Sequence, residues 1–126
     1  MFPRLEPHAY ALLRIVTGLL FIFHGLQKFG FFGGRLADLM TRYGAAAIIE
    51  VVGGALVMVG LFTAPVAFIC SGQMAAAYFL SHAPQAFWPI QNRGELAVLY
   101  CFVFLYVAAR GSGMWSLDWV RGQKKR

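Results

Sequence analysis

Five ionisable side chains interrupt the apolar stretches of this sequence, and they are the first candidates for chemistry. They are Arg14, His24, Lys28, Glu50 and Glu95. An ionised side chain at the centre of a bilayer costs about 3 kcal/mol or more, so such residues are rare there and often bind ligands or move protons. The secondary candidates are the uncharged polar residues Gln73, His82 and Asn92.

The same residues also have a purely structural interpretation. Carboxylates and cations inside a helical bundle can simply tie helices together, and an isolated histidine such as His24 is usually a hydrogen-bonded packing residue. No metal site is expected. The Glu-x-x-His pattern of carboxylate di-iron bundles is absent. In addition, His24 and His82 have no cysteine or histidine partner at metal-ligand spacing.

The spacing of the two cysteines does not indicate a redox dithiol. Cys70 lies near the inner start of one apolar segment, and Cys101 lies near the outer start of the next. At 1.5 Å per residue the vertical offset is about 10 Å or more, whereas a disulfide needs Cα atoms roughly 4.4–6.8 Å apart. No Cys-x-x-Cys motif is present. We therefore expect two separate buried thiols.

The composition places these residues in membrane helices. Of the 126 residues, 60% are apolar and 13% are charged, whereas a soluble domain has about 25% charged residues. A chain this small cannot bury so much apolar surface in its own core, so lipid is its natural solvent. Four apolar segments without strand-like alternation lie near residues 9–29, 45–62, 65–83 and 93–110. They predict an all-α fold, an integral membrane four-helix bundle that forms one domain over residues 1–126.

Small residues and short connections fit such a bundle. Glycines are common in membrane helices generally, but they also let helix backbones approach closely. The glycines expected at helix contacts are Gly18, Gly25, Gly53 and Gly54. The Gly-rich connection between the first two segments has room for a short interfacial helix around Leu36–Tyr43.

Antiparallel helices would deliver most of the polar residues to one end of the bundle. Counting 1.5 Å per residue gives five of them a similar depth near the outer end: His24, Lys28, Glu50, His82 and Glu95. We expect Lys28 to pair with Glu50 or with Glu95. Arg14 lies toward the other end, where no acid shares its depth. Its guanidinium would extend to the membrane surface, bind free carbonyls at a helix end, or hold a ligand.

The net charge of +6 does not indicate a nucleic-acid partner. The positive residues form no long run except in the tail 121–126, and a basic tail after a membrane helix is typical of contact with lipid headgroups. Lysine and arginine are slightly more frequent on the side of the termini, which predicts that both termini are cytoplasmic. The first apolar segment lacks a signal-peptide cleavage site, so we expect it to remain as the first helix.

Four motifs follow one another along the chain. The first helix reads Leu-Leu-Arg14-Ile-Val-Thr-Gly18 and then His24-Gly25-Leu-Gln-Lys28-Phe29, and the second reads Glu50-Val-Val-Gly53-Gly54. The fourth opens with Asn92-Arg-Gly94-Glu95, and Gly111-Ser-Gly113-Met-Trp-Ser116-Leu-Asp118 follows it. In this order the set resembles the DoxX family of small bacterial membrane proteins over nearly the whole chain. The resemblance implies four helices in the bacterial inner membrane, with Arg14, Lys28, Glu50 and Glu95 at the family's polar positions.

The resemblance implies a link to redox chemistry, because the family takes its name from a subunit of a thiosulfate:quinone oxidoreductase. The first hypothesis is therefore a non-catalytic membrane subunit or anchor of a redox-linked assembly, working with other subunits or as a homo-oligomer and touching quinone. The second is a quinone-linked oxidoreductase in its own right, which the sequence disfavours because no haem, flavin or cluster motif is evident. The third is a small oligomeric transporter or channel lined by the intramembrane charges.

Overall fold

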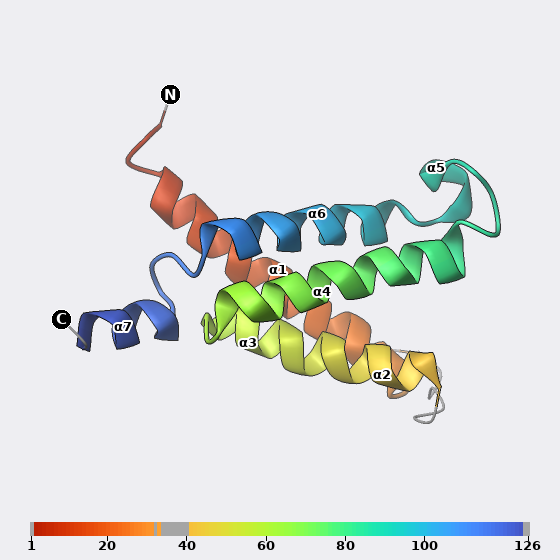
Figure 1. Ribbon diagram of the computed structural model, residues 1–126, viewed down its shortest axis with the longest axis horizontal. Helices are drawn as coiled ribbons and strands as arrows, with labels where there is room; N and C mark the ends of the chain where they lie inside the picture. The colour runs from red at the N-terminus through yellow and green to blue at the C-terminus, as the bar shows by residue number, and fades with distance from the viewer. Residues whose placement is uncertain (1, 32, 34–40, 125–126) are drawn as a thin grey trace.

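Helices make up the regular structure of the part of the chain that the structure describes, residues 2–31, 33 and 41–124 of a computed structural model. In chain order they are α1 (Glu6–Lys28), α2 (Arg42–Ile48), the π-helix η1 (Ile49–Gly53), α3 (Gly54–Val59), α4 (Thr63–Ala77), the π-helix η2 (Tyr78–His82), α5 (Pro89–Asn92), α6 (Glu95–Arg110) and α7 (Leu117–Lys124) (Figure 1). The interfacial helix predicted around Leu36–Tyr43 lies mostly outside the described residues.

Four continuous helical rods occupy the four apolar segments. They are α1, the run α2–η1–α3, the run α4–η2, and α6. Within the described residues, the first three are long and apolar enough to cross a membrane. The fourth, α6, has 16 residues, about 24 Å of helix against a hydrocarbon core of about 30 Å. The helical membrane bundle is therefore present, and a fourth crossing by α6 stays a prediction.

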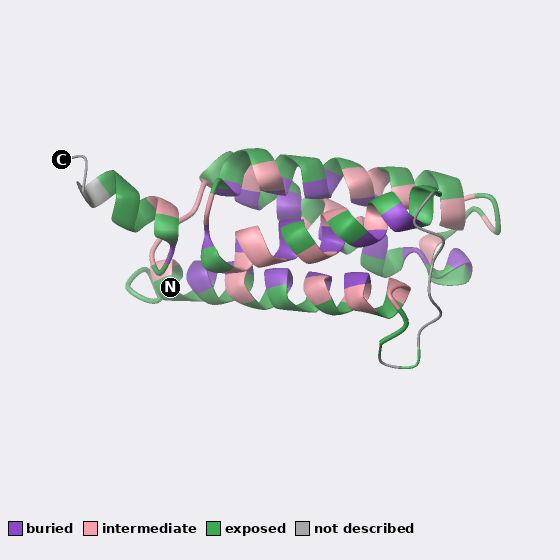
Figure 2. Ribbon diagram, turned by 90° about the horizontal axis from the view of Figure 1, so that it is seen from below, coloured by how far each residue is buried: buried purple, intermediate pink, exposed green. Residues whose placement is uncertain are grey.

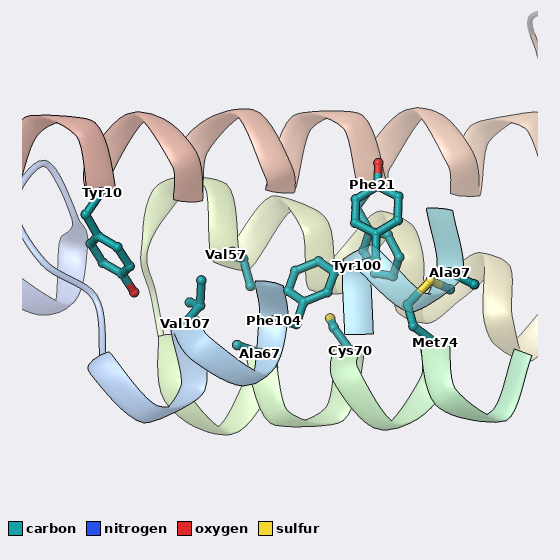
Figure 3. Close-up of a cluster of buried hydrophobic side chains, with 10 residues drawn as sticks. All are labelled: Tyr10, Phe21, Val57, Ala67, Cys70, Met74, Ala97, Tyr100, Phe104 and Val107. Carbon is teal, nitrogen blue, oxygen red and sulfur yellow. The ribbon is translucent and has the colours of Figure 1, made fainter. Parts of the chain in front are cut away.

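The rods pack as two pairs. The α4 rod runs alongside α6, whereas α1 packs against the run α2–η1–α3 and lies oblique to α6 in Figure 1. Aromatic rings fill the space between the pairs. The Phe21 ring lies 4.7 Å from the Phe104 ring and 5.3 Å from the Tyr100 ring, measured between centroids (Figure 3). These contacts join α1 to α6 through the core.

Large apolar side chains also cover the outside of the bundle. Buried residues form stripes on the inward faces of the rods, while the outward faces are exposed (Figure 2). Leucines and phenylalanines such as Leu12, Leu20, Phe68 and Phe102 are between 46% and 65% exposed. In water so much continuous apolar surface would drive aggregation, so this exterior is suited to lipid.

The contact between α1 and α3 depends on two facing glycines. A Cβ atom on Gly18 would lie 2.6 Å from the Gly54 carbonyl oxygen, and one on Gly54 would lie 2.7 Å from the Gly18 carbonyl oxygen. No side chain fits at either position without moving the backbones apart. The close approach maximises van der Waals contact, which stabilises helix pairs in lipid where the hydrophobic effect does not.

The segment after α6 folds back onto the bundle, which the sequence interpretation did not include. Gly111 and Gly113 have positive φ angles of 95° and 68° and allow the chain to reverse. The Ser116 hydroxyl then accepts the Trp119 amide at 3.2 Å, which is an N-cap arrangement for α7. From there α7 projects beyond the end of the bundle in both Figure 1 and Figure 2.

Candidate functional site

A pocket of about 460 Å³ opens at the end of the bundle where α1 ends and α6 begins. All four rods contribute to its wall. Most of the wall is apolar, with Met74, Leu80 and Leu96 among several alanines, and polar groups lie between them. The volume falls within the range of about 300–1,000 Å³ that small-molecule sites occupy, and such sites are mostly apolar with a few placed polar groups.

An ion pair between Lys28 and Glu50 lies in the wall of this pocket. The Lys28 ammonium donates to both oxygens of the Glu50 carboxylate, at 2.9 Å to Oε1 and 2.6 Å to Oε2. The two side chains differ in exposure, with Lys28 29% exposed and Glu50 2% exposed. The pair therefore presents its cationic end to the pocket and keeps its carboxylate behind. Of the two acids that the sequence left open, Glu50 is the partner.

Other polar side chains approach the same pocket from the neighbouring rods. His24 lies one helical turn before Lys28 and contacts the Tyr100 ring edge-on at 5.5 Å between centroids. Gln73 reaches toward the Glu50 carboxylate from α4, and its Oε1 is buried without a hydrogen-bond partner in the described structure. The Nδ1 atom of His82 lies 3.1 Å from the carbonyl oxygen of Asn92, and His82 also lines the pocket.

The two π-helical turns both lie at this pocket. Glu50 belongs to η1 and His82 to η2, and both residues line the cavity. A π turn inserts one residue into an α-helix, shifts the side chains after it around the axis, and occurs often at functional sites. Periodicity alone cannot locate such a shift. The direction in which the Glu50 side chain points from its helix could therefore not be predicted from the sequence.

Two of the predicted polar residues do not belong to this network. Glu95 was expected in the buried cluster, but it is exposed and lies in a separate shallow depression with Arg93 and Leu99. Arg93 has a φ angle of 61° and turns the chain between α5 and α6, so that Glu95 points outward at the start of α6. Asn92 is fully buried but holds this turn together, since it bonds Tyr78, the Ala86 carbonyl and the Gly94 amide.

Arg14 lies at the opposite end of the bundle and binds carbonyls. Its Nη1 donates to the carbonyls of Val57 and Met58 at 2.8 and 2.7 Å, and its Nη2 donates to those of Met114 and Trp115 at 3.2 and 2.8 Å. The side chain is fully buried. Of the three alternatives for Arg14, carbonyl binding at a helix end is therefore the one present. The guanidinium ties the last turn of α3 to the returning C-terminal segment.

Residues that the sequence interpretation missed also line the pocket. They are Arg42, Tyr43, Ser81 and Tyr100. The first three sit at helix ends whose boundaries a hydropathy pattern does not fix. Tyr100 follows Glu95 by five residues in an apolar run, where nothing in its spacing distinguishes it from a core aromatic residue.

Asp118, also missed, caps α4 from the C-terminal segment. Its carboxylate accepts the Phe62 amide at 2.9 Å and both the amide and the hydroxyl of Thr63 at 2.8 Å. Burial raises the pKa of Asp118, but the hydrogen bonds from Thr63 and Phe62 and the nearby Arg121 outweigh it and leave the pKa below its ordinary value of 3.8. Asp118 lies on α7, outside the membrane-spanning helices.

We expect this cap to make the C-terminal contact sensitive to acid. Because folding lowers the pKa, the ionised carboxylate stabilises the fold fully above the unfolded pKa, and this stabilisation is lost as the pH falls through the folded pKa. Thermal unfolding in detergent should show the wild type losing stability below about pH 4 more than Asp118→Asn does. Parallel pH profiles for the two proteins would contradict the cap.

Comparison with known proteins agrees with this architecture. The DoxX family model matches residues 9–83, which is more than half of the chain and includes α1, the run α2–η1–α3 and the run α4–η2. The chain belongs to the DoxX family. Both halves of the Lys28–Glu50 pair lie in the part of the DoxX chain that the model matches, whereas Arg93 and Tyr100 follow it. Together with the apolar helices, the family makes this a membrane protein.

Two relatives of this DoxX chain are similar over most of their length. An "Uncharacterized protein" of Haemophilus influenzae (strain ATCC 51907 / DSM 11121 / KW20 / Rd) is 43% identical over 123 residues, which cover 90% of each chain. The "Putative oxidoreductase CatD" of Bacillus subtilis (strain 168) is 32% identical over 114 residues, which cover 85% of this chain and 82% of that protein. No solved structure matches the chain.

Proposed function

We propose that this DoxX protein is a non-catalytic membrane subunit of a redox-linked assembly, and that its pocket holds the ring of a quinone. The observation that carries the proposal is the Lys28–Glu50 pair, whose ammonium faces a mostly apolar cavity at one end of the bundle. A buried charge pair is costly to keep in a membrane protein, and a binding site is a reason to keep it. The Bacillus relative, which is named a "Putative oxidoreductase", supports a link between the family and redox chemistry.

The residues of the pocket fit both the oxidised quinone, which has ring carbonyls, and the reduced quinol, which has ring hydroxyls. Lys28 has three N–H donors and uses two of them on Glu50, which leaves one for a ring carbonyl. Gln73 Oε1, the buried acceptor without a partner in the described structure, suits a ring hydroxyl. The apolar wall excludes water from the ring. A bound quinone would supply a reversible two-electron, two-proton carrier, and the electrons would come from a partner subunit.

The test is a gentle purification followed by a search for quinone and partners. The protein would be extracted in an uncharged mild detergent, and quinone in the purified sample would be measured by solvent extraction and mass spectrometry. We expect retained quinone, and added 2-methyl-1,4-naphthoquinone should raise the unfolding temperature of the wild type but not of Lys28→Met/Glu50→Gln. No retained quinone together with no stabilisation would contradict the proposal.

A quinone-linked oxidoreductase acting alone is the second candidate, because the Bacillus relative is named a "Putative oxidoreductase". Reduction of added quinone by the purified chain with a simple thiol as electron donor would favour it. Reduction that requires a co-purifying protein would favour the subunit role, in which the DoxX chain binds the ligand and the partner supplies the electrons.

We also propose that the protein lies in the bacterial inner membrane with both termini in the cytoplasm. Its support is the excess of arginine and lysine at the end that holds Arg4, Arg110 and Arg121. A reporter that is active only in the cytoplasm should be active when fused after Arg126. Activity of a periplasm-dependent reporter at the same position would reverse the orientation and put the pocket on the cytoplasmic side.

A further inference from the structure

The charges around the pocket are unequal in sign. Three cationic residues line it, Lys28, Arg42 and Arg93, and one carboxylate, Glu50. The Glu50 carboxylate is 2% exposed and both of its oxygens already accept hydrogen bonds from Lys28. Among the described residues, Glu95 is the nearest further acid along the chain to Arg93, and it lines the adjacent depression, not this pocket. A ligand in the pocket therefore meets cations and no free carboxylate of the described residues.

The cations reach the pocket from different parts of the fold. Lys28 ends α1 and lines the pocket together with His24 and Tyr100, whose rings are in edge-on contact. Arg93 lies at the turn before α6, and it forms no salt bridge with an acid of the described residues. Low-dielectric walls strengthen the field of charges placed in this way, because little water is present to screen them.

We infer that the pocket selects quinones that carry an acidic ring hydroxyl and bind as anions, in preference to neutral quinones of the same size. The inference rests on the proposed function and narrows it to a ligand class. The anionic oxygen lies near the ammonium of Lys28 and the guanidinium of Arg93, and the apolar ring lies against Met74 and Leu96. A neutral quinone gains the same apolar contacts without the charge interaction.

Two naphthoquinones of nearly equal size make the test. The ring hydroxyl of 2-hydroxy-1,4-naphthoquinone is ionised at neutral pH, whereas 2-methyl-1,4-naphthoquinone is neutral. Binding of each to the full chain in uncharged detergent would be measured by thermal shift and by quenching of tryptophan fluorescence. We expect the hydroxyquinone to bind about tenfold more tightly at neutral pH, which is what two partly exposed charge interactions supply.

Two variants and one change of pH show whether charge causes this preference. Arg93→Gln removes a cation at the pocket, and Arg121→Gln removes an exposed cation on α7 at the opposite end. The preference should fall several-fold in Arg93→Gln and stay unchanged in Arg121→Gln. It should also disappear at a pH low enough to protonate the hydroxyquinone.

The outcomes separate this inference from the proposed function. Equal or weaker binding of the hydroxyquinone than of the methylquinone would overturn the anion preference and leave a quinone site. Absence of binding by both compounds would overturn the quinone site itself. Equal loss of the preference in Arg93→Gln and Arg121→Gln would assign it to the net charge of the protein, which also overturns the inference. Tight binding of 1-naphthoate, an anion without a quinone ring, would replace the quinone with a general organic anion.

Discussion

Replacing Arg14 with methionine should destabilise the protein more than any other single charge removal at that end of the bundle. The change leaves four carbonyl groups, on Val57, Met58, Met114 and Trp115, without their donor. Buried acceptors that lose their partners cost about 1–3 kcal/mol each where water cannot replace the donor. We expect a loss of about 3–5 kcal/mol in the free energy of unfolding, because some of these carbonyls will find water.

Thermal unfolding in detergent measures this effect, and Arg110→Met is the matched control. Arg110 belongs to an exposed ion pair with Glu6 at 2.7 Å, and exposed pairs contribute about 1 kcal/mol or less. Arg14→Lys should recover only part of the loss, because an ammonium does not have the planar fork that reaches carbonyls on two segments. Trypsin should also cleave at Arg121 faster in Arg14→Met. Losses of similar size in Arg14→Met and Arg110→Met would contradict the role assigned to Arg14.

The second large effect concerns the Lys28–Glu50 pair. Glu50→Gln and Lys28→Met should each lower the unfolding temperature, since each leaves a charge without its partner in a low-dielectric site. Breaking a buried pair costs about 3–5 kcal/mol in soluble proteins, whereas polar couplings in a membrane protein average about 0.6 kcal/mol. We expect a value between these limits, and the double variant should recover part of it.

The double-mutant cycle is measured by thermal unfolding, with Glu95→Gln as the control. Glu95 is an acid at the same end of the bundle, but it is exposed and outside the pocket, so its loss should change stability little. Strictly additive losses for Lys28→Met and Glu50→Gln would mean that the two residues are not coupled. If the pocket binds a ligand through the pair, the double variant should regain stability without regaining binding.

The depth of the polar residues could be predicted from the sequence, but their direction could not. Helical rise fixes how far Lys28 and Glu50 lie along the bundle, and that was enough to place them together. Direction depends on rotation about the helix axis, which the π turn containing Glu50 alters. For Glu95, direction depends on the left-handed residue Arg93. Spacing along the chain therefore could not decide between Glu50 and Glu95 as the partner of Lys28.

The C-terminal segment shows a different limit. Residues 117–124 are half polar and too short for a membrane helix, so hydropathy did not reveal α7. The Ser116-x-x-Trp119 cap was a local signal for a helix start. Local signals do not reveal long-range partners, and neither the Asp118 bonds to Thr63 nor the Arg14 bonds to Met114 and Trp115 could be read from spacing.

The hydrogen bonds of Arg14 also impose an order on biosynthesis. Arg14 enters the membrane with the first helix, but the Met114 and Trp115 carbonyls are 100 and 101 residues further along the chain. During translation, at about 5–20 residues per second, the guanidinium must remain solvated by headgroups or by the insertion machinery for seconds. The bundle can close around this side chain only after the segment that carries Met114 and Trp115 has been made. Assembly around the first helix is thus completed by a segment that is synthesised 100 residues after Arg14.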